Sequence, residues 1–332
     1  MLMYRSACML IVVFTGIWMM LAPIPVWSHG ESVRGVGGVG IETTGGEILR
    51  EGIAVAVHYD LRKYNLFSEQ QMLDFMKQGE DVHQHSREQT TLMSVTFGLG
   101  KRWDLSAQIG YGRFSNFQDN SDTFAQVTGK ISKTDVSDGL TDLLIMGRYQ
   151  FYKNEERDQH AALIMGIKLP TGNYRARVNQ AAPGQSRPEL VGTHNQIGSG
   201  SVDFLLGTAY TGHLADVIGI SADLLARVNT EGAKSFRSGN SIQVDLAVAY
   251  RPHARIVPSV ELNYIAQERD IEDDEVKTNS GVTSLFVTPG VTIRLFDRHS
   301  VFANASFPVI QILPGIQNEE AFRISGGWSF AF

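Results

Sequence analysis

The sequence predicts an all-β protein, a transmembrane antiparallel up-and-down β-barrel of about twelve strands. Three observations lead to this prediction. The chain ends on a strand with one aromatic face, segments of the same alternating kind recur along it, and the links between them are alternately short and long. An apolar run near the N-terminus further indicates that the chain is exported.

The closing strand, residues 322–332, places Ile324, Trp328, Phe330 and Phe332 on one face and small or polar residues on the other. A soluble protein gains little from ending on such an unprotected edge, because free edges aggregate. In a closed membrane barrel the aromatic face meets lipid. Trp328, Phe330 and Phe332 also resemble the closing strand by which bacterial outer-membrane proteins are recognised for assembly.

At the other end of the chain, Arg5 precedes an apolar run at residues 9–22, and prolines then break the run. This pattern is typical of a secretory signal peptide over residues 1–28, cut after Ser28, with an uncleaved membrane anchor as the alternative. The only cysteine, Cys8, lies inside it. The mature chain is therefore expected to contain no thiol and no disulfide.

Twelve segments alternate apolar residues with small or polar ones. They are residues 53–61, 93–99, 105–111, 143–151, 161–169, 202–210, 218–228, 242–250, 256–264, 285–295, 301–309 and 322–332. The clearest is 242–250, where Ile, Val, Leu, Val and Tyr share one face. An even number of strands places both termini on the same side, which we expect to be the periplasm.

The links decide between a membrane barrel and a soluble sandwich, which would show the same alternation. Short links at 100–102, 153–158, 213–216, 251–254 and 296–299 alternate with long ones at 62–88, 116–138, 172–200 and 267–280. Short periplasmic turns opposite long external loops are the outer-membrane arrangement. We therefore expect a barrel over residues 47–332, preceded by a Gly-rich periplasmic leader or partial plug at residues 29–46.

The net charge excludes some partners. It is −6, and loss of the signal peptide with Arg5 makes it −7. Such mild acidity argues against a nucleic-acid partner, which would require a basic patch. The expected partners are outer-membrane lipid, the barrel-assembly machinery and a small solute.

Charged residues of both signs fall on the face opposite the apolar one, and we expect them to line the lumen and set its selectivity. They are Asp142, Arg148, Lys168, Asp203, Asp223, Arg227, Asp245, Glu261, Arg294 and Arg323. A mixed lining indicates either a narrow polar path or salt-bridged packing that stiffens the barrel.

The first long loop contains a predicted helix. Ser68 and Gln71 form a capping box, Phe67 and Met72 can form a hydrophobic staple, and Gly79 is placed to end the helix. The helix could close the mouth as a lid or rest on the rim.

His83 and His85 follow this helix and could share a metal ion, with nearby carboxylates completing the site. Solvated loop histidines are the alternative. No nucleophile, base and oxyanion-hole pattern is present, so we expect neither an enzyme nor a cofactor.

Three stretches carry a family resemblance: Gly-Leu-Thr-Asp-Leu-Leu at 139–144, Lys-Leu-Pro-Thr-Gly at 168–172 and Gly-Ser-Gly-Ser-Val-Asp-Phe-Leu-Leu-Gly at 198–207. Together they resemble the outer-membrane barrel family described as "MetA-pathway of phenol degradation". The resemblance implies a channel for small aromatic or other apolar molecules.

The functional hypothesis is a passive channel or transporter for small solutes in the bacterial outer membrane. The first alternative is a non-conducting structural or adhesive barrel whose external loops bind a partner. The second is a metal-handling surface protein that uses His83 and His85.

Overall fold

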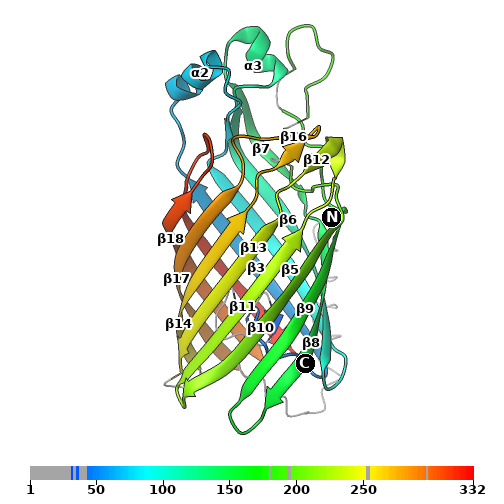
Figure 1. Ribbon diagram of the computed structural model, residues 1–332, viewed down its shortest axis with the longest axis vertical. Helices are drawn as coiled ribbons and strands as arrows, with labels where there is room; N and C mark the ends of the chain where they lie inside the picture. The colour runs from blue at the N-terminus through cyan, green and yellow to red at the C-terminus, as the bar shows by residue number, and fades with distance from the viewer. Residues whose placement is uncertain are drawn as a thin grey trace, which may run out of the picture.

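The computed structural model describes residues 31–32, 35–36 and 43–332, except 179–180, 191, 193–195, 252–254 and 297. Twelve antiparallel strands close into a barrel with short turns at one end and long loops with two helices at the other (Figure 1). We call these ends the short-turn end and the long-loop end. In the described part of the chain, no helix is long and apolar enough to cross a bilayer. The predicted fold class is confirmed, and the periplasmic location of the termini stays a prediction.

Each predicted segment coincides with one barrel strand. The strands are β3 (Ile53–Tyr64), β5 (Arg87–Gly98), β6 (Trp103–Asp119), β8 (Leu143–Asn154), β9 (Gln159–Leu169), β10 (Asp203–Ala215), β11 (Ile218–Val228), β13 (Ser241–Tyr250), β14 (Ile256–Gln267), β17 (Val282–Phe296), β18 (His299–Ile312) and β19 (Glu320–Ala331). Every strand pairs with its neighbours in this order, and β19 pairs with β3.

The barrel closes where the two ends of the sheet meet. The nitrogen of Ile53 donates to the carbonyl of Phe332 at 2.7 Å, and the nitrogen of Phe332 donates back at 2.8 Å. Gly52 precedes this pair with a φ of 88°, and a Cβ there would lie 2.3 Å from the Phe332 oxygen. Only glycine fits at this closure.

The outer surface is apolar and the interior polar, the reverse of a soluble protein. On β13, Leu246 and Val248 are 48% and 51% exposed, whereas Asp245 and Ala247 are 0% and 2% exposed. Trp328 and Phe332 on the closing strand are also exposed, whereas Ser325 and Ser329 on the same strand face inward. An apolar surface of this extent requires a lipid environment.

The interpretation of residues 116–138 as a loop was wrong. Strand β6 continues to Asp119, helix α3 (Thr123–Thr128) follows, and β7 (Ser132–Leu140) returns along β6. Strand β7 then leads into β8 through Thr141 and Asp142. The two strands run in the same direction along β6 and together act as one strand with a short break. This hairpin lies beyond the apolar belt and needs no apolar alternation, which explains why the pattern missed it.

The predicted helix in the first loop is α2 (Glu69–Lys77), and its capping box is confirmed. The Ser68 hydroxyl accepts from the Gln71 nitrogen at 3.3 Å, and the Gln71 side chain accepts from the Ser68 nitrogen at 2.9 Å. Met72 is fully buried against Val82, and Phe67 packs on the same cluster. The helix therefore belongs to a small apolar core at the long-loop end (Figure 1).

The remaining elements are short. They are the hairpin β1 (Glu31–Ser32) and β2 (Gly35–Val36), strand β4 (His83–Gln84) on β6, the turn η3 (Ala233–Ser235), and a small sheet of β12 (Phe236–Arg237), β15 (Ile271–Glu272) and β16 (Glu275–Val276).

Candidate functional site

Residues 43–50, which we call the inner segment, lie inside the barrel. Thr43 donates to the Glu261 carboxylate on β14, and Leu49 donates through its nitrogen to Asp104 on β6 at 2.9 Å. Five strands separate β6 from β14 along the wall in either direction, so the two strands lie opposite each other. Thr43, Ile48 and Leu49 are at most 4% exposed. The inner segment therefore crosses the lumen from one part of the wall to another.

A buried ion pair contacts the inner segment near both of its ends. The Arg148 guanidinium binds both oxygens of Asp104, with Nε 3.0 Å from Oδ1 and Nη2 on Oδ2, and Arg148 Nη1 donates to the Thr44 carbonyl at 3.3 Å. Both charged side chains are at most 2% exposed. The inner segment adds one hydrogen bond to each member of the pair, through the Thr44 carbonyl and the Leu49 nitrogen, which helps to satisfy these buried charges.

The inner segment also packs closely on the wall. The nitrogen of Gly46 donates to Thr211 at 2.9 Å, and its carbonyl accepts from Gln150 at 3.2 Å. A Cβ at Gly46 would lie 2.3 Å from the carbonyl oxygen of His160. Any larger residue would push the segment away from this wall.

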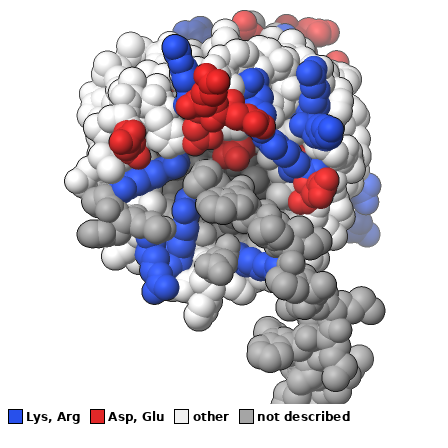
Figure 2. Space-filling model, turned by 90° about the horizontal axis from the view of Figure 1, so that it is seen from below, with Lys and Arg blue, Asp and Glu red and all other residues white. Residues whose placement is uncertain are grey.

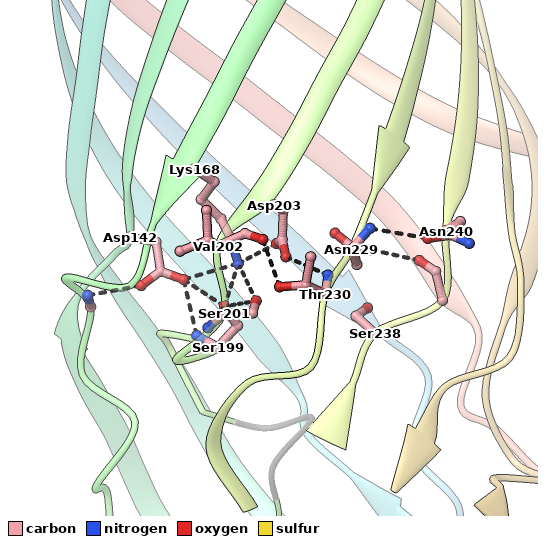
Figure 3. Close-up of polar contacts among 12 residues, drawn as sticks. Asp142, Lys168, Ser199, Ser201, Val202, Asp203, Asn229, Thr230, Ser238 and Asn240 are labelled. Atoms are coloured by element: carbon pink, nitrogen blue, oxygen red, sulfur yellow. Dashed lines mark hydrogen bonds and ion pairs between the residues drawn. The ribbon is translucent and has the colours of Figure 1, made fainter. Parts of the chain in front are cut away.

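A second group of charges lies where the barrel meets the long loops (Figure 3). Lys168 Nζ is 3.1 Å from Asp142 Oδ2, 2.5 Å from Asp203 Oδ2 and 3.2 Å from the Ser201 hydroxyl, and it also contacts Ser199. We call Asp142, Lys168, Ser199, Ser201 and Asp203 the motif cluster. Its residues come from the start of β8, the end of β9 and the start of β10 with the turn before it.

The carboxylates of the motif cluster also fix loop backbone. Asp142 accepts from the nitrogens of Gly172 at 2.8 Å and Ser199 at 3.0 Å, and Asp203 accepts from the nitrogen of Thr230 at 3.1 Å. Lys168 thus lies between two carboxylates that are themselves hydrogen-bonded. Such satisfied groups make a rigid junction between three long links.

The three sequence stretches that carry the family resemblance meet in this cluster. Asp142 belongs to the stretch 139–144, Lys168 begins 168–172, and Asp203 lies in 198–207. A Cβ added to Gly198 would lie 2.6 Å from the backbone of Gly172, so the two glycines permit the close contact between the stretches.

The motif cluster borders a cavity of about 450 Å³, which we call the central cavity. Its charged lining residues are Asp142, Lys168, Asp203, Arg227 and Asp270. A second cavity of about 640 Å³ shares Gln196, Gly198 and Ser199 with it. A third, of about 310 Å³, shares Gln267 and Asp270 and contains Tyr64, His83 and His85. Two external cavities therefore adjoin one inner cavity.

The other predicted lumen residues lie in different places. Asp223 and Asp245 are buried opposite each other on β11 and β13, and Asn263 donates to Asp245 at 2.9 Å. Arg323 pairs with Glu320 at 3.1 Å near the long-loop end of β19.

The short-turn end has its own charged groups. Arg294 lines a cavity of about 770 Å³ there together with Arg251, whose Nη1 lies 3.2 Å from His213 Nε2. Figure 2 shows this end, with Lys and Arg side chains spread around the mouth and Asp and Glu between them. No single sign of charge dominates this mouth.

His83 and His85 lie among aromatic rings. The His83 ring centre is 6.4 Å from that of Phe117, and the His85 centre is 4.5 Å from Tyr64 and 4.8 Å from Phe114. Burial lowers the pKa of His83 to about 4. Among the residues that the structure describes, no three His, Asp or Glu side chains are grouped to hold a metal ion. The metal site stays a hypothesis without geometric support.

Sequence reasoning missed three residues that bind the inner segment: Asp104, Gln150 and Thr211. Asp104 lies just before the predicted segment 105–111, and the other two carry no signal beyond strand parity. Their partners are far away in the sequence, so no local pattern could have identified them.

Twelve closed strands with an apolar exterior and a polar interior define a bacterial outer-membrane β-barrel. Residues 113–309, more than half of the chain, match the family described as "MetA-pathway of phenol degradation". The chain belongs to this family, which confirms the resemblance found in the sequence.

Two solved structures share the fold. The COG4313 outer membrane channel from Pseudomonas putida F1 is 14% identical, with a TM-score of 0.58 over 86% of this chain and 98% of that one. The transport unit of the autotransporter AIDA-I from Escherichia coli is 12% identical, with a TM-score of 0.50 over 85% and 90%. No curated protein matches the sequence.

Proposed function

We propose that the chain is a passive outer-membrane channel for small solutes, with the long-loop end facing outward and the short-turn end in the periplasm. The observation that carries the proposal is the set of adjoining cavities that leads from the long loops to the polar interior at the motif cluster. The solved structure named as an outer membrane channel supports this function through its shared fold. Transport, rather than catalysis, is the activity that this arrangement favours.

The central cavity fits a small solute. Its volume of about 450 Å³ lies within the roughly 300–1,000 Å³ typical of sites for small molecules. Leu92 and Leu144 lie on its wall beside the charged groups, so one molecule could contact apolar and polar surface together. A small aromatic molecule with one polar or charged group has this character, and the family description names phenol degradation.

The inner segment narrows the path beyond this cavity. Its contacts with Glu261, Arg148, Thr211 and Asp104 fill part of the lumen on the side away from the long loops. We infer that residues 29–46 form a leader whose last residues act as a partial plug, and that residues 47–332 form the barrel domain, of which residues 47–50 continue the inner segment before the first strand at Ile53. The predicted signal peptide, 1–28, lies outside the described residues.

The closing strand supports the proposed partners. Trp328 and Phe332 are 36% and 43% exposed on the outer face, and the rings of Trp328 and Phe330 stack at 6.2 Å. Such an aromatic belt suits the boundary between lipid tails and head groups. The same three side chains are the proposed signal for the barrel-assembly machinery.

Conductance measurements test the channel. Purified barrel in a planar bilayer should give discrete current steps, and a variant lacking residues 29–46 should give larger ones because part of the lumen is released. Liposomes that contain either protein should swell in small solutes such as glycerol. A folded barrel that gives neither current nor swelling would contradict the channel and favour the structural or adhesive alternative.

A further inference from the structure

One of the two external cavities is lined by positive charge. The cavity of about 640 Å³ contains Arg175, Arg177 and Lys234, and no acidic side chain is among its described lining residues. The other external cavity contains Asp270 and neither lysine nor arginine among its described lining residues. This difference is unexpected in a chain with a net charge of −6. It concentrates positive potential at one of the two routes to the central cavity.

The cations are held in place by specific contacts. Arg177 Nη1 donates to the Pro188 carbonyl at 2.7 Å. The Arg175 guanidinium carbon lies 5.2 Å from the centre of the Tyr174 ring, and the guanidinium donates to the same tyrosine's hydroxyl at 3.3 Å. In both arginines other N–H groups remain that can bind a ligand, because one guanidinium carries five.

Lys234 has an unusual backbone. Its φ of 55° and ψ of 40° lie in the left-handed region that residues with a Cβ rarely adopt. The turn around it is docked on the motif cluster, because Ala233 donates to the Ser199 carbonyl at 3.1 Å and a Cβ at Gly232 would lie 2.3 Å from the same oxygen. The motif cluster therefore sets the position of Lys234, and strain of this kind is often retained at functional sites.

Glu189, a carboxylate that interacts with one of these cations, is already engaged in hydrogen bonds. Glu189 interacts electrostatically with Lys234, but its oxygens accept from the Thr123 hydroxyl at 2.5 Å and from Gln185 at 3.0 Å. These hydrogen bonds keep the pKa of Glu189 low and hold its carboxylate outside the cavity lining. Glu189 thus reduces the positive potential without neutralising all three cations.

We propose that this cavity, the cationic vestibule, binds the carboxylate group of small organic acids before they pass to the central cavity. The inference rests on the proposed channel function and names its substrate class. A guanidinium fork matches a carboxylate in geometry, and Lys234 adds a movable point charge. Gln196 and Ser199 line both cavities, so a bound acid reaches the central cavity by a short step.

The balance of charge changes along this path. The vestibule contains three cations, whereas the central cavity contains Lys168 and Arg227 together with three aspartates. An anion is therefore attracted at the mouth and held less strongly further in. Conduction requires this combination, because a solute must enter readily and still leave.

Bilayer recordings with benzoate and benzyl alcohol test the proposal. The two probes share a ring and differ in charge. Benzoate on the long-loop side should reduce the ion current in a saturable way, and benzyl alcohol should not. The variant Arg175→Gln/Arg177→Gln/Lys234→Gln should raise the half-maximal benzoate concentration by about tenfold, the size expected for losing several exposed charge contacts.

A matched control removes three cations from the short-turn end. The variant Lys101→Gln/Arg102→Gln/Arg157→Gln changes the net charge equally and should leave benzoate inhibition from the long-loop side unchanged. Equal inhibition in the wild type and the vestibule variant, in a barrel that conducts, would overturn the vestibule and leave the channel intact. A folded wild type that does not conduct would overturn the channel itself.

Discussion

Glu261 accepts two hydrogen bonds from Thr43, at 3.1 Å from its nitrogen and 2.9 Å from its hydroxyl, although 218 positions separate the residues. Glu261 is fully buried. The contact joins the inner segment to a wall strand near the far end of the chain. A carboxylate that we expect to line the lumen therefore also fixes the inner segment to the wall.

The variant Glu261→Gln should therefore loosen the inner segment. Hydrogen bonds to a charged group contribute about 1.5–3 kcal/mol, so the fraction of detached segment should rise by roughly 10- to 100-fold. Larger or noisier current steps would report this. Because Cys8 lies in the predicted signal peptide, Thr44→Cys provides a single labelling site in the mature chain. This cysteine should react faster with maleimide when Glu261→Gln is also present.

The control for this variant is Glu275→Gln, which removes an equal charge from an exposed position on β16. It should leave both the current and the labelling rate unchanged. If the cysteine of Thr44→Cys reacts at the same rate with and without the Glu261→Gln substitution, the inner segment does not depend on this contact.

Removing one member of the Arg148–Asp104 pair should lower the free energy of unfolding of the barrel by more than Glu261→Gln does. Asp104→Asn leaves a buried guanidinium without its charged partner, which typically costs about 3–5 kcal/mol. The urea midpoint for unfolding of the barrel from vesicles should fall accordingly. The double variant Asp104→Asn/Arg148→Met removes both charges and should recover part of the loss; no difference between single and double variants would contradict a coupled pair.

The barrel could be predicted well from the sequence because the pattern that identifies each strand lies within the strand itself. Each strand alternates lipid-facing and lumen-facing residues, so parity alone placed Leu246 outside and Asp245 inside. Strand β7 escaped this rule because it extends beyond the apolar belt, where neither face needs to be apolar.

The site was predicted only in part. Asp142, Lys168 and Asp203 were each assigned to the lumen, but their meeting depends on register, which places Asp203 opposite Lys168 on β10 and β9. Register is set by whole-strand pairing and loop geometry rather than by residues near the contact. Nothing near Thr43 indicated that it would reach Glu261, because that contact depends on the path of the inner segment through the closed barrel.

The capping box should stabilise helix α2 in the first loop. Ser68→Ala should remove the hydroxyl that accepts from the Gln71 nitrogen and destabilise α2 by about 1 kcal/mol. Hydrogen exchange of residues 69–77 should then increase about fivefold. Ser68→Asp retains a capping oxygen and should exchange like the wild type, and equal exchange in all three proteins would show that the cap contributes nothing.

The same loop should loosen in acid. Burial lowers the pKa of His83 to about 4, whereas an exposed imidazole has a value of 6.5. Below pH 6.5 the undocked loop binds a proton that the docked loop excludes, so docking loses stability as the pH falls from about 6.5 to about 4. The loss should reach roughly 1–2 kcal/mol by pH 5.

Limited proteolysis of residues 65–86 at pH 7.5 and pH 5 would measure this loosening. The variant His83→Phe keeps a ring beside Phe117 and has no group to titrate, so its cleavage should depend much less on pH. His213→Gln, at the short-turn end, should retain the wild-type dependence. If cleavage of His83→Phe and of the wild type increases equally in acid, another group causes the pH dependence of loop docking. The burial of His83 would then not explain it.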